Sequence, residues 1–377
     1  MRRRSWLLLA TLAALATLVA LPAQAGAGVG AGRYIVVLKN AVDSRAVANL
    51  HSARYGASVD NVWSVALHGY SAVIPNDRVA ALRADQNVAY VVADGVATAT
   101  AQVLPWGVDR IDADLSSTLA GNGSGAITNV DAYVIDTGID ISHPDLNVVE
   151  FRSFIGGPKT DCNGHGSHVA GTIGARDDAN GVVGVAPGLR LHAIKVLNCS
   201  GSGSWSSVIN GINYVAGTIA RPAVANMSLG GAQNSAVDDA VKGAVGRGVF
   251  FAVAAGNDGA NACGHSPADA GTTGGVATTA ATDSTEHEAS WSNYGSCVDL
   301  WAPGVSIYST YKNGGYATLS GTSMATPHVA GGAALYLSTH ATASPSNVET
   351  ALKNAAVSTN TSSKDGRAIK REYVRTF

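Results

Sequence analysis

Three polar residues in this sequence could together perform nucleophilic catalysis: Asp136, His165 and Ser323. A serine hydroxyl becomes a nucleophile when a histidine accepts its proton, and a carboxylate then orients the histidine ring and stabilises the imidazolium that forms. The three residues lie in the motifs DTGID, NGHGSHVAGT and GTSMATPHVAG, in the chain order Asp, His, Ser. These residue types predict acyl transfer through a serine nucleophile.

A helix should follow the candidate nucleophile. Residues 326–337 are rich in alanine, and their single proline, Pro327, comes early enough for a first turn. Free backbone N–H groups and the positive end of the helix dipole gather at such a start, where they stabilise an oxyanion. The simplest alternative is that Ser323 only caps the helix. Partners elsewhere in the chain must decide between the two.

The two partners also stand at the ends of regular elements. Residues 133–135 are β-branched and aromatic and predict a buried parallel strand, with Asp136 at its carboxyl end, where open α/β sheets place their sites. His165 lies between Gly164 and Gly166 at the head of a small-residue helix, and the glycines permit close backbone approach. We therefore predict Asp136 as the orienting carboxylate and His165 as the general base.

Strands and helices alternate through the larger part of the chain. This alternation predicts an α/β fold: a doubly wound, mostly parallel sheet with helices on both faces. The expected strands are 131–135, 190–197, 223–227 and 249–255, and the expected helices start at 165 and span 204–220 and 237–245.

A smaller α+β domain should precede the large one. Its expected elements are a strand at 34–38, a helix at 44–55, strands at 61–67 and 70–74, a helix at 77–82 and a strand at 88–93. This order is the split βαβ pattern. No catalytic constellation falls within it.

The first 25 residues predict a secretory signal peptide. Three arginines precede an apolar run from 6 to 21, which ends at Ala23-Gln24-Ala25, a small-residue cleavage site. The alternative is a transmembrane anchor, for which the run is short. We therefore expect a secreted, extracellular protein.

Composition and net charge indicate the domain organisation and the classes of partner that the protein is not expected to bind. With 377 residues, 46% of them hydrophobic, the chain can form one large domain and a smaller one, and its formal charge of −2 gives no electrostatic case for nucleic acid or an anionic membrane. Nothing in the sequence signals an obligate oligomer, so we expect a monomer.

The three motifs, in this order, resemble those of the subtilisin-like serine proteases. Within that family the sequence is most similar to the secreted proteinase K and aqualysin branch, because the cysteine placements and the stretch SNYGSCVDL at 292–300 also match. The resemblance is close over residues 103–340. It implies a secreted serine endopeptidase that cleaves unfolded or flexible polypeptides through an acyl-enzyme.

The resemblance extends to the smaller domain, which is similar to the family's inhibitory propeptide. It implies an intramolecular inhibitor that the enzyme removes by autolysis in the small, uncharged segment 96–102. The expected organisation is a signal peptide at 1–25, a propeptide domain at 26–97 and a catalytic domain at 98–377.

The matching motifs also imply roles for residues of the substrate site. Asn257 would donate its side-chain amide to the oxyanion, beside the backbone N–H of Ser323. Taken alone, the sequence GNDG favours a turn residue at Asn257, and the context of the triad reverses that preference. The residues implied in substrate binding are Gly201, Ser202, Gly203, Ser228, Leu229, Gly230, Ala254, Ala255 and Gly256. These segments carry no charge, which implies broad, apolar-leaning specificity.

Four cysteines, Cys162, Cys199, Cys263 and Cys297, permit three disulfide pairings. The resemblance implies the pairs Cys162–Cys199 and Cys263–Cys297. A zinc site built from Cys162, His165 and His168 is the competing interpretation, but it lacks a CxxC motif and a fourth nearby thiol.

The resemblance further implies structural calcium. Asp299 matches a carboxylate that binds calcium together with backbone carbonyls near Pro267, although a buried or capping aspartate is an equal alternative. Asp109 and Asp112 are tentative ligands in an acidic turn that could equally be solvated. No organic cofactor is implied.

Two other classes of function compete with the protease. A catalytically inactive, peptide-binding protein of the same fold would have lost a member of the triad, and all members are present. A Ser-His-Asp esterase normally places its serine in a G-x-S-x-G elbow, whereas Ser323 is followed by Met324 and Ala325.

Overall fold

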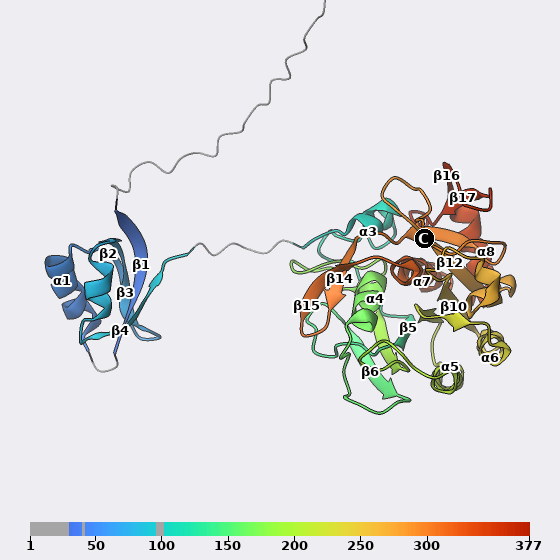
Figure 1. Cartoon of the computed structure of the whole chain (residues 1–377), viewed down its shortest axis with the longest axis horizontal. Coiled ribbons are helices and arrows are strands. Elements are labelled where there is room, and N and C mark those ends of the chain that lie inside the picture. The colour runs from blue at the N-terminus through green and yellow to red at the C-terminus, as the bar shows by residue number, and fades with distance from the viewer. Residues whose placement is uncertain (1–29, 40–41, 96–101) are drawn as a thin grey trace, which may run out of the picture. The chain divides into compact units, whose positions relative to one another are not determined.

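The computed structural model describes residues 30–39, 42–95 and 102–377, which fall into two compact units, 1–99 and 100–377 (Figure 1). The expected signal peptide and most of the expected cleavage segment lie outside the described residues. Within the described ranges, no helix combines the length and the apolar character needed to cross a membrane.

The first unit is a four-stranded antiparallel sheet with two helices. Its elements are β1 (Ala31–Leu38), α1 (Ser44–Tyr55), β2 (Ser58–Ser64), β3 (His68–Pro75), α2 (Val79–Arg83) and β4 (Val88–Ala93), with strand order β2-β3-β1-β4. The predicted βαββαβ order is confirmed. The first hairpin turns earlier than predicted, because Val65 is 95% exposed at the turn and does not continue the strand.

The second unit is built on a nine-stranded sheet of order β16-β17-β13-β12-β10-β8-β5-β7-β6. Every neighbouring pair is parallel except β16 with β17. The sheet strands are β5 (Asp131–Asp136), β6 (Val148–Ser153), β7 (Arg190–Lys195), β8 (Ala223–Met227), β10 (Val249–Ala254), β12 (Val276–Thr282), β13 (Leu300–Pro303), β16 (Val357–Ser362) and β17 (Ala368–Arg371).

Shorter strands and helices surround this sheet. Two antiparallel strand pairs lie outside it: β9 (Gly231–Ala232) with β11 (His265–Ser266), which are distant in sequence, and the hairpin of β14 (Ile307–Tyr311) with β15 (Gly315–Leu319). The α-helices are α3 (Trp106–Arg110), α4 (His165–Gly174), α5 (Trp205–Thr218), α6 (Ser235–Val245), α7 (Thr322–Thr339) and α8 (Pro345–Ala355).

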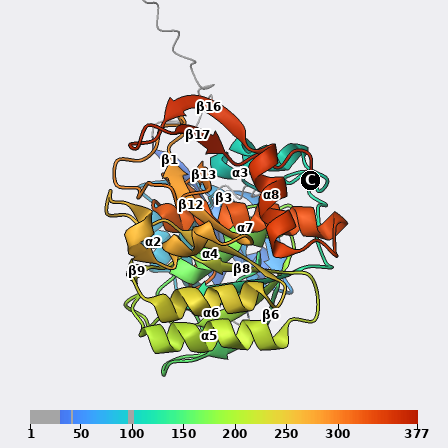
Figure 2. The same ribbon diagram turned by 90° about the vertical axis from the view of Figure 1, so that its right-hand side faces the viewer.

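The helices cover both faces of this sheet, as predicted. Along β5, Ala132 and Val134 pack into a core with α4, α7 and α8, whereas Tyr133 and Ile135 point to the opposite face and pack against α5 and α6. Helices α5 and α6 lie side by side on that second face (Figure 2). The short apolar strands are therefore buried on both sides, which is why they do not alternate with polar residues.

The parallel arrangement brings several strand ends to one edge. β5 pairs with β8, and β8 pairs with β10, all in the same direction. Their carboxyl ends deliver Asp136, Ser228 and Ala255 to the same side of the sheet. This edge is where the candidate catalytic residues gather.

Lysines and arginines at 364, 367, 370, 371 and 375 predict a solvated basic tail at the end of the catalytic domain, and the structure departs from this expectation. Strands β16 and β17 join the sheet edge, and Arg371 is only 5% exposed. Its guanidinium pairs with Glu286 at 2.8 Å and donates to the carbonyl of Arg110.

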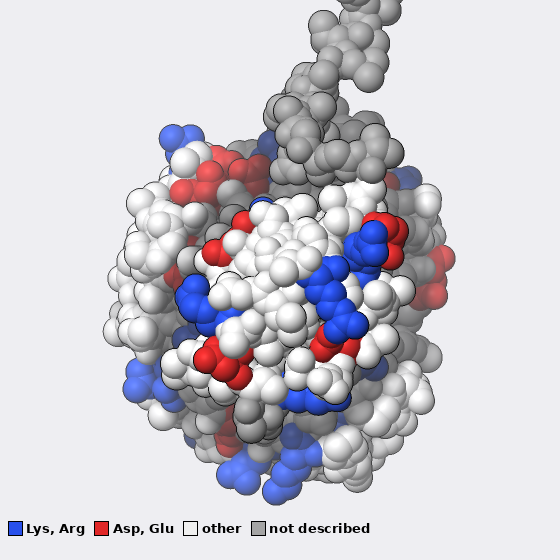
Figure 3. Space-filling model, turned by 90° about the vertical axis from the view of Figure 1, so that its left-hand side faces the viewer, with Lys and Arg blue, Asp and Glu red and all other residues white. Residues whose placement is uncertain are grey.

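The face of the molecule shown in Figure 3 carries interspersed cationic and anionic side chains, in keeping with the small net charge of the chain.

A buried carboxyl follows β17. Glu372 is fully buried, and neither of its carboxyl oxygens has a hydrogen-bond partner among the described residues. It packs against Gly332 of α7, where an added Cβ would lie 2.3 Å from Glu372 Oε1. Burial raises the pKa of Glu372 from 4.5 to about 8, with the charge of Arg371 opposing the shift. The folded state therefore holds this proton across neutral pH.

Glu372→Gln is expected to remove a pH dependence of stability. The folded pKa exceeds the unfolded one, so the wild type should lose about 1.4 kcal/mol of unfolding free energy per pH unit as the pH rises from 4.5 towards 8. Urea unfolding of inactive Ser323→Ala protein should give nearly equal stabilities at pH 4, below the unfolded pKa, and a more stable Gln variant at pH 9. Parallel pH profiles for the two proteins would contradict the prediction.

Candidate active site

Asp136 and His165 meet where β5 ends and α4 begins. His165 Nδ1 lies 2.8 Å from Asp136 Oδ1 and 3.0 Å from Oδ2. The carboxylate is fully buried and also accepts the backbone N–H of Thr137 at 2.6 Å, whereas the His165 side chain is 26% exposed. Because an ionised carboxylate only accepts, Nδ1 carries the proton and Nε2 is left to act as a base.

Two glycines allow this approach. Gly164 is the N-cap of α4 with φ of 108°, a conformation that side chains disfavour. A Cβ on Gly166 would lie 2.0 Å from the carbonyl oxygen of Gly138, so the first turn of α4 rests directly on the segment after β5. The glycines flanking His165 are therefore required by packing.

Burial, the largest influence, lowers the pKa of His165, but the hydrogen-bonded carboxylate of Asp136 and the charge of Asp161 outweigh it and raise the pKa above 6.5. The site therefore stabilises the imidazolium form. This is the form that a general base reaches after it takes up a proton.

Ser323 is the second residue of α7, which begins at Thr322 and not at 326 as expected. The difference depends on Pro327, which lies inside the helix and lacks the N–H that would bond to the carbonyl of Ser323. The hydroxyl of Ser228 donates to that carbonyl instead, at 2.8 Å. A side chain from the end of β8 thus compensates for the proline, and the helix starts earlier.

The hydroxyl of Ser323 donates to the carbonyl of Ser228 at 3.0 Å. Among the described residues, no hydrogen bond joins Ser323 Oγ to the His165 ring. The serine is tied to the end of β8, and rotation about its χ1 redirects the hydroxyl, since χ1 has three staggered positions. The structure brings Asp136 and His165 into contact and fixes Ser323 at the same sheet edge.

Asn257 follows β10 and is held by the residue next to the nucleophile. Its Oδ1 accepts the backbone N–H of Thr322 at 2.8 Å and the Thr322 hydroxyl at 2.9 Å. Because both partners are donors, they identify this atom as the amide oxygen, and the amide nitrogen Nδ2 is left to donate to another group. An ideal Cβ position on Gly321 lies 3.6 Å from both Asn257 Nδ2 and Ser323 N, so the two donors flank a common space.

Two cavities at this edge hold the residues expected to bind substrate. One, of about 490 Å³, is lined by His165, residues 201–203 and residues 228–232, and the other, of about 220 Å³, by Ser323, Asn257 and residues 254–256. Both share residues 229–231. The described residues thus form two adjoining cavities, one beside the base and one beside the nucleophile.

The second cavity is not free of charge as expected. Asp258 and His265 also line it, with Asp258 Oδ2 3.5 Å from His265 Nε2. The Asp258 side chain is 68% exposed, which places its charge in solvent contact. The sequence argument overlooked Asp258, which follows Asn257 directly, and it missed His265 because this residue, distant in sequence, reaches the cavity through the pairing of β11 with β9.

Three supporting residues also escaped the sequence argument. Thr322 orients Asn257, and the side chain of Asn293 holds the loop after β10 by accepting from Asp258 N and Ala260 N and donating to Ala255 O. Asp161 binds the start of α4. Only Asp161 left a local signal, an acidic residue shortly before a predicted helix.

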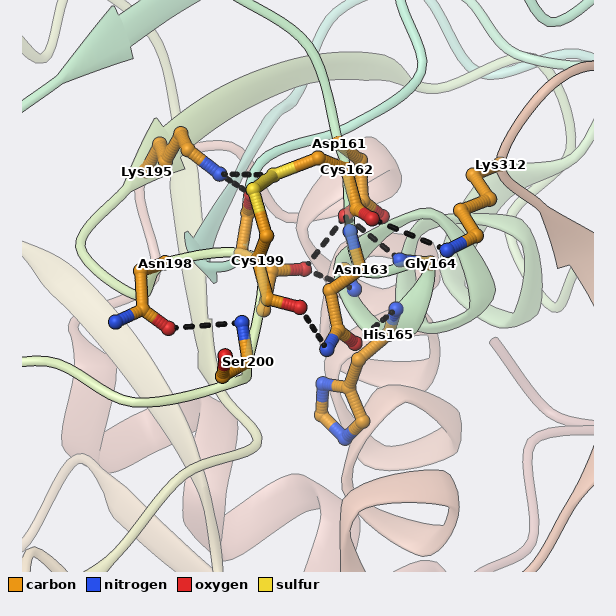
Figure 4. The surroundings of a disulfide bond; sticks show 12 residues. Asp161, Cys162, Asn163, Gly164, His165, Lys195, Asn198, Cys199, Ser200 and Lys312 are labelled. Atoms are coloured by element: carbon orange, nitrogen blue, oxygen red, sulfur yellow. Dashed lines mark hydrogen bonds between the residues drawn. A yellow bond between two sulfur atoms is a disulfide. The ribbon is translucent and has the colours of Figure 1, made fainter. Parts of the chain in front are cut away.

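The four cysteines form two disulfides, Cys162–Cys199 and Cys263–Cys297. These are the pairs that the resemblance implied, so the competing zinc site has no free thiol. Sequence separations of 37 and 34 residues correspond to about 3–4 kcal/mol of loop-closure entropy each. The first disulfide links the segment before His165 to the segment before residues 201–203 (Figure 4).

Comparison with known proteins identifies the family. Residues 130–373 match the subtilase family, and the chain is 47% identical over 310 residues to an extracellular serine proteinase of a Thermus species, covering 79% of this chain and 73% of that protein. The chain belongs to the subtilase family. It is a serine-type endopeptidase.

Other comparisons agree with this assignment. This subtilase is 45% identical to alkaline serine exoprotease A of Vibrio alginolyticus over 79% of the chain, and it spans 57% of that protein's length. A crystal structure of a cold-adapted subtilisin-like serine proteinase matches with a TM-score of 0.64 and 43% identity, covering 73% of this chain and 99% of that one. Residues 33–99 match peptidase inhibitor I9, so the smaller unit carries a propeptide-type inhibitor domain.

The surroundings of Asp299 do not fit a calcium ion. Its Oδ1 accepts from Lys353 Nζ at 2.7 Å and its Oδ2 from Thr278 N at 2.9 Å, while the carbonyl of Pro267 accepts from Ala270 N. The lysine ammonium supplies the cation at Asp299.

Lys353→Met is expected to lower the unfolding free energy by roughly 1–3 kcal/mol at pH 8, because it leaves a buried charge unpaired and Lys353 itself is partly solvated. Burial raises the pKa of Asp299 to about 6, with Lys353 opposing the shift, so Asp299 is ionised at pH 8. Urea unfolding in the Ser323→Ala background measures the loss. The control Lys242→Met, in an exposed pair with Asp239, should change stability by less than about 0.5 kcal/mol.

The ion pair between Asp299 and Lys353 also predicts how calcium affects thermal stability. Any rise in Tm on adding calcium should be equal in the wild type and in Asp299→Asn, since the carboxylate already binds Lys353. A calcium effect lost in Asp299→Asn would identify it as a ligand and contradict the assignment.

Proposed function

We propose that this subtilase is a secreted endopeptidase in which Ser323 is the nucleophile, His165 the general base, Asp136 the orienting carboxylate and Asn257 an oxyanion donor. The observation that carries the proposal is the 2.8 Å hydrogen bond from His165 Nδ1 to the buried carboxylate of Asp136. It fixes the tautomer in which Nε2 can accept the serine proton. The cavity beside Nε2 adjoins the cavity lined by Ser323.

Each step of the reaction uses a group already described. His165 Nε2 takes the proton of Ser323 Oγ as the oxygen attacks the peptide carbonyl, and Asn257 Nδ2 and the Ser323 N–H stabilise the oxyanion. The imidazolium then gives its proton to the leaving amine, and an acyl-enzyme remains. Water, deprotonated by His165, hydrolyses the ester and restores the serine.

We propose that an extended peptide binds along the two glycine-containing segments. Residues 201–203 and 228–230 line the cavity beside His165, and their backbone groups offer strand-like pairing to a substrate. Ala254, Ala255 and Gly256 form an uncharged part of the adjoining cavity. The expected specificity is broad and favours apolar side chains, with Asp258 affecting only the exposed part of the cavity.

The inhibitor-type domain is proposed to bind the enzyme until autolysis removes it. Among the described residues, one face of its sheet exposes apolar side chains of β4: Tyr90 is 53% and Val92 44% exposed, while Val88 and Val91 pack into the core of this unit. An apolar sheet face of this kind supports binding to a protein surface. We propose the boundaries 1–25 for the signal peptide, 26–97 for the propeptide and 98–377 for the enzyme, and a monomeric mature form.

We propose a calcium ion only at the acidic turn that contains Asp109, Asp112 and Asp114. Burial and the charges of Asp109 and Asp112 raise the pKa of Asp114. Among the described residues, no three ligating side chains are arranged to hold a metal, so a calcium ion here would need most of its oxygen ligands from the backbone and solvent. A hard cation would relieve their repulsion. Asp299 is not proposed as a ligand.

Labelling with a sulfonyl fluoride tests the proposal. We expect one adduct per molecule, located on Ser323 by peptide mass mapping, and loss of casein hydrolysis in proportion to labelling. Labelling with hydrolysis of esters but not of peptides would instead support an esterase. Absence of labelling, with peptides still bound, would support an inactive binding protein.

A further inference from the structure

The start of α4 is held by a carboxylate that takes no part in the reaction. The N-cap residue, Gly164, has no side chain to accept the free N–H groups of the first turn. Asp161, only 3% exposed, accepts instead from Gly164 N at 2.8 Å (Figure 4). It also accepts from Ser167 N at 2.9 Å. A negative charge here also complements the helix dipole.

The same carboxylate reaches the segment that carries Asp136. Thr137 Oγ1 donates to Asp161 Oδ1 at 2.9 Å, and it accepts from Gly166 N at 2.9 Å. Thr137 follows Asp136 directly and donates its backbone N–H to the Asp136 carboxylate. Asp161 therefore bonds to both segments whose side chains form the His165–Asp136 hydrogen bond.

The lone pairs of Asp161 are fully engaged. Oδ1 accepts from Thr137 Oγ1, Asn163 N and Gly164 N, and Oδ2 accepts from the backbone and hydroxyl of Ser167. Thr137 and Ser167 are completely buried. Since each donor would be costly to leave unpaired, this set admits one orientation of the carboxylate.

A buried lysine balances the two carboxylates. Lys195, at the end of β7, is fully buried, and its ammonium donates to the carbonyl of Thr137 and lies 3.7 Å from Cys162 Sγ (Figure 4). Burial lowers the pKa of Lys195, and the charges of Asp161 and Asp136 oppose that shift. The positive charge of Lys195 therefore offsets part of the charge of the two carboxylates.

We propose that Asp161 is a positioning residue for catalysis: by bonding to Thr137 and to the first turn of α4, it keeps the His165 ring aligned with Asp136. The inference rests on the proposed role of His165 as general base. Asp161 does not touch the reacting atoms, so its removal should affect the alignment and the charge around His165 but not the contacts with substrate.

The charges around His165 make this testable by pH. Asp136 comes from β5, Asp161 from the segment before α4, Lys195 from β7 and His168 from α4 itself. Burial lowers the pKa of His165, and Asp136 and Asp161 both raise it. Neutralising Asp161 should therefore lower that pKa.

Asp161→Asn is the decisive variant, because it keeps the shape but replaces one accepting oxygen with a donor. We expect kcat for a neutral peptide substrate to fall about 10–100-fold with little change in KM, as for a misaligned base. The acid limb of the kcat/KM profile should move to lower pH. Unchanged kcat and an unmoved limb would overturn the proposal.

Asp177→Asn is the matched control. Asp177 is also buried and accepts from the backbone N–H groups of Gly121, Gly123 and Gly125, away from the site. We expect a lower Tm but the wild-type kcat and acid limb. Equal changes in Asp177→Asn would show that loss of loop structure alone explains Asp161→Asn, and would overturn the positioning role.

Ser167→Ala keeps the test valid should Asp161→Asn not fold. It removes the hydroxyl that donates to Asp161 Oδ2 and accepts from Asp140 N, and it retains the charge of Asp161, so kcat should fall several-fold while the acid limb stays in place. Wild-type kcat in this variant would count against the proposal. Failure of the proposed function would differ from all these results, because the wild type itself would then not be labelled at Ser323.

Discussion

Ser323→Ala is expected to lower kcat for peptide hydrolysis by roughly 10⁴–10⁶-fold, because it removes the hydroxyl proposed to form the acyl-enzyme. The residual rate should come from the oxyanion donors and substrate binding, so KM should change little. The Asp136–His165 hydrogen bond does not involve Ser323, and the fold should be retained. Stopped assays with a chromogenic peptide, together with circular dichroism, measure both effects.

Maturation of the same variant tests autolysis. Intact mass and N-terminal sequencing should show that the wild type loses all residues before about 98–102, whereas Ser323→Ala keeps them. Ser290→Ala, at an exposed serine, is the control and should mature like the wild type. If the wild type and Ser323→Ala are trimmed alike, another protease matures the chain, and the autolytic step is wrong even though the nucleophile stands.

Asp136→Asn should cost roughly 10⁴-fold in kcat. An asparagine can present an N–H to His165 Nδ1, which favours the tautomer whose Nε2 already carries a proton and cannot accept one from Ser323. The variant also removes the carboxylate that raises the pKa of His165, so the acid limb of the remaining activity should move to lower pH. The loss should be in kcat, since Asp136 is fully buried and does not contact substrate.

The pH profile of kcat/KM over a wide range measures this effect. Asp136→Glu provides a second measurement: it restores the charge but cannot keep the 2.8 Å geometry, so it should recover the position of the acid limb better than the rate. Activity of Asp136→Asn within tenfold of the wild type would remove Asp136 from the mechanism.

The sequence determined those features that local patterns encode. Apolar runs such as 249–254 must be buried on both faces, which requires a parallel sheet between two helix layers, and the comparison with known structures confirms that class. The order of elements in residues 31–93 was predictable for the same reason. The motifs around Asp136, His165 and Ser323 also limited the chemistry, since they combine a nucleophile, a base and a carboxylate at element ends.

Local patterns located element ends less well. The first hairpin turn was placed too late, since Val62 to Leu67 are mostly apolar in sequence while Val65 is exposed in the fold. The sequence analysis also placed the start of helix α7 four residues too late, because a proline normally lies in the first turn of a helix. Its true start depends on Ser228, whose hydroxyl satisfies the carbonyl that Pro327 leaves free.

Only the tertiary structure decided which charges meet. Asp299 binds Lys353, 54 residues away, and not the cation that its local motif implied, and Asp258 and His265 bring charge to a cavity expected to have none. Arg371 and Glu372 are buried in a segment that composition alone predicted to be solvated. The physical reason is that a buried polar group must find its partner in three dimensions, and partners distant in sequence leave no periodicity for a local argument to detect.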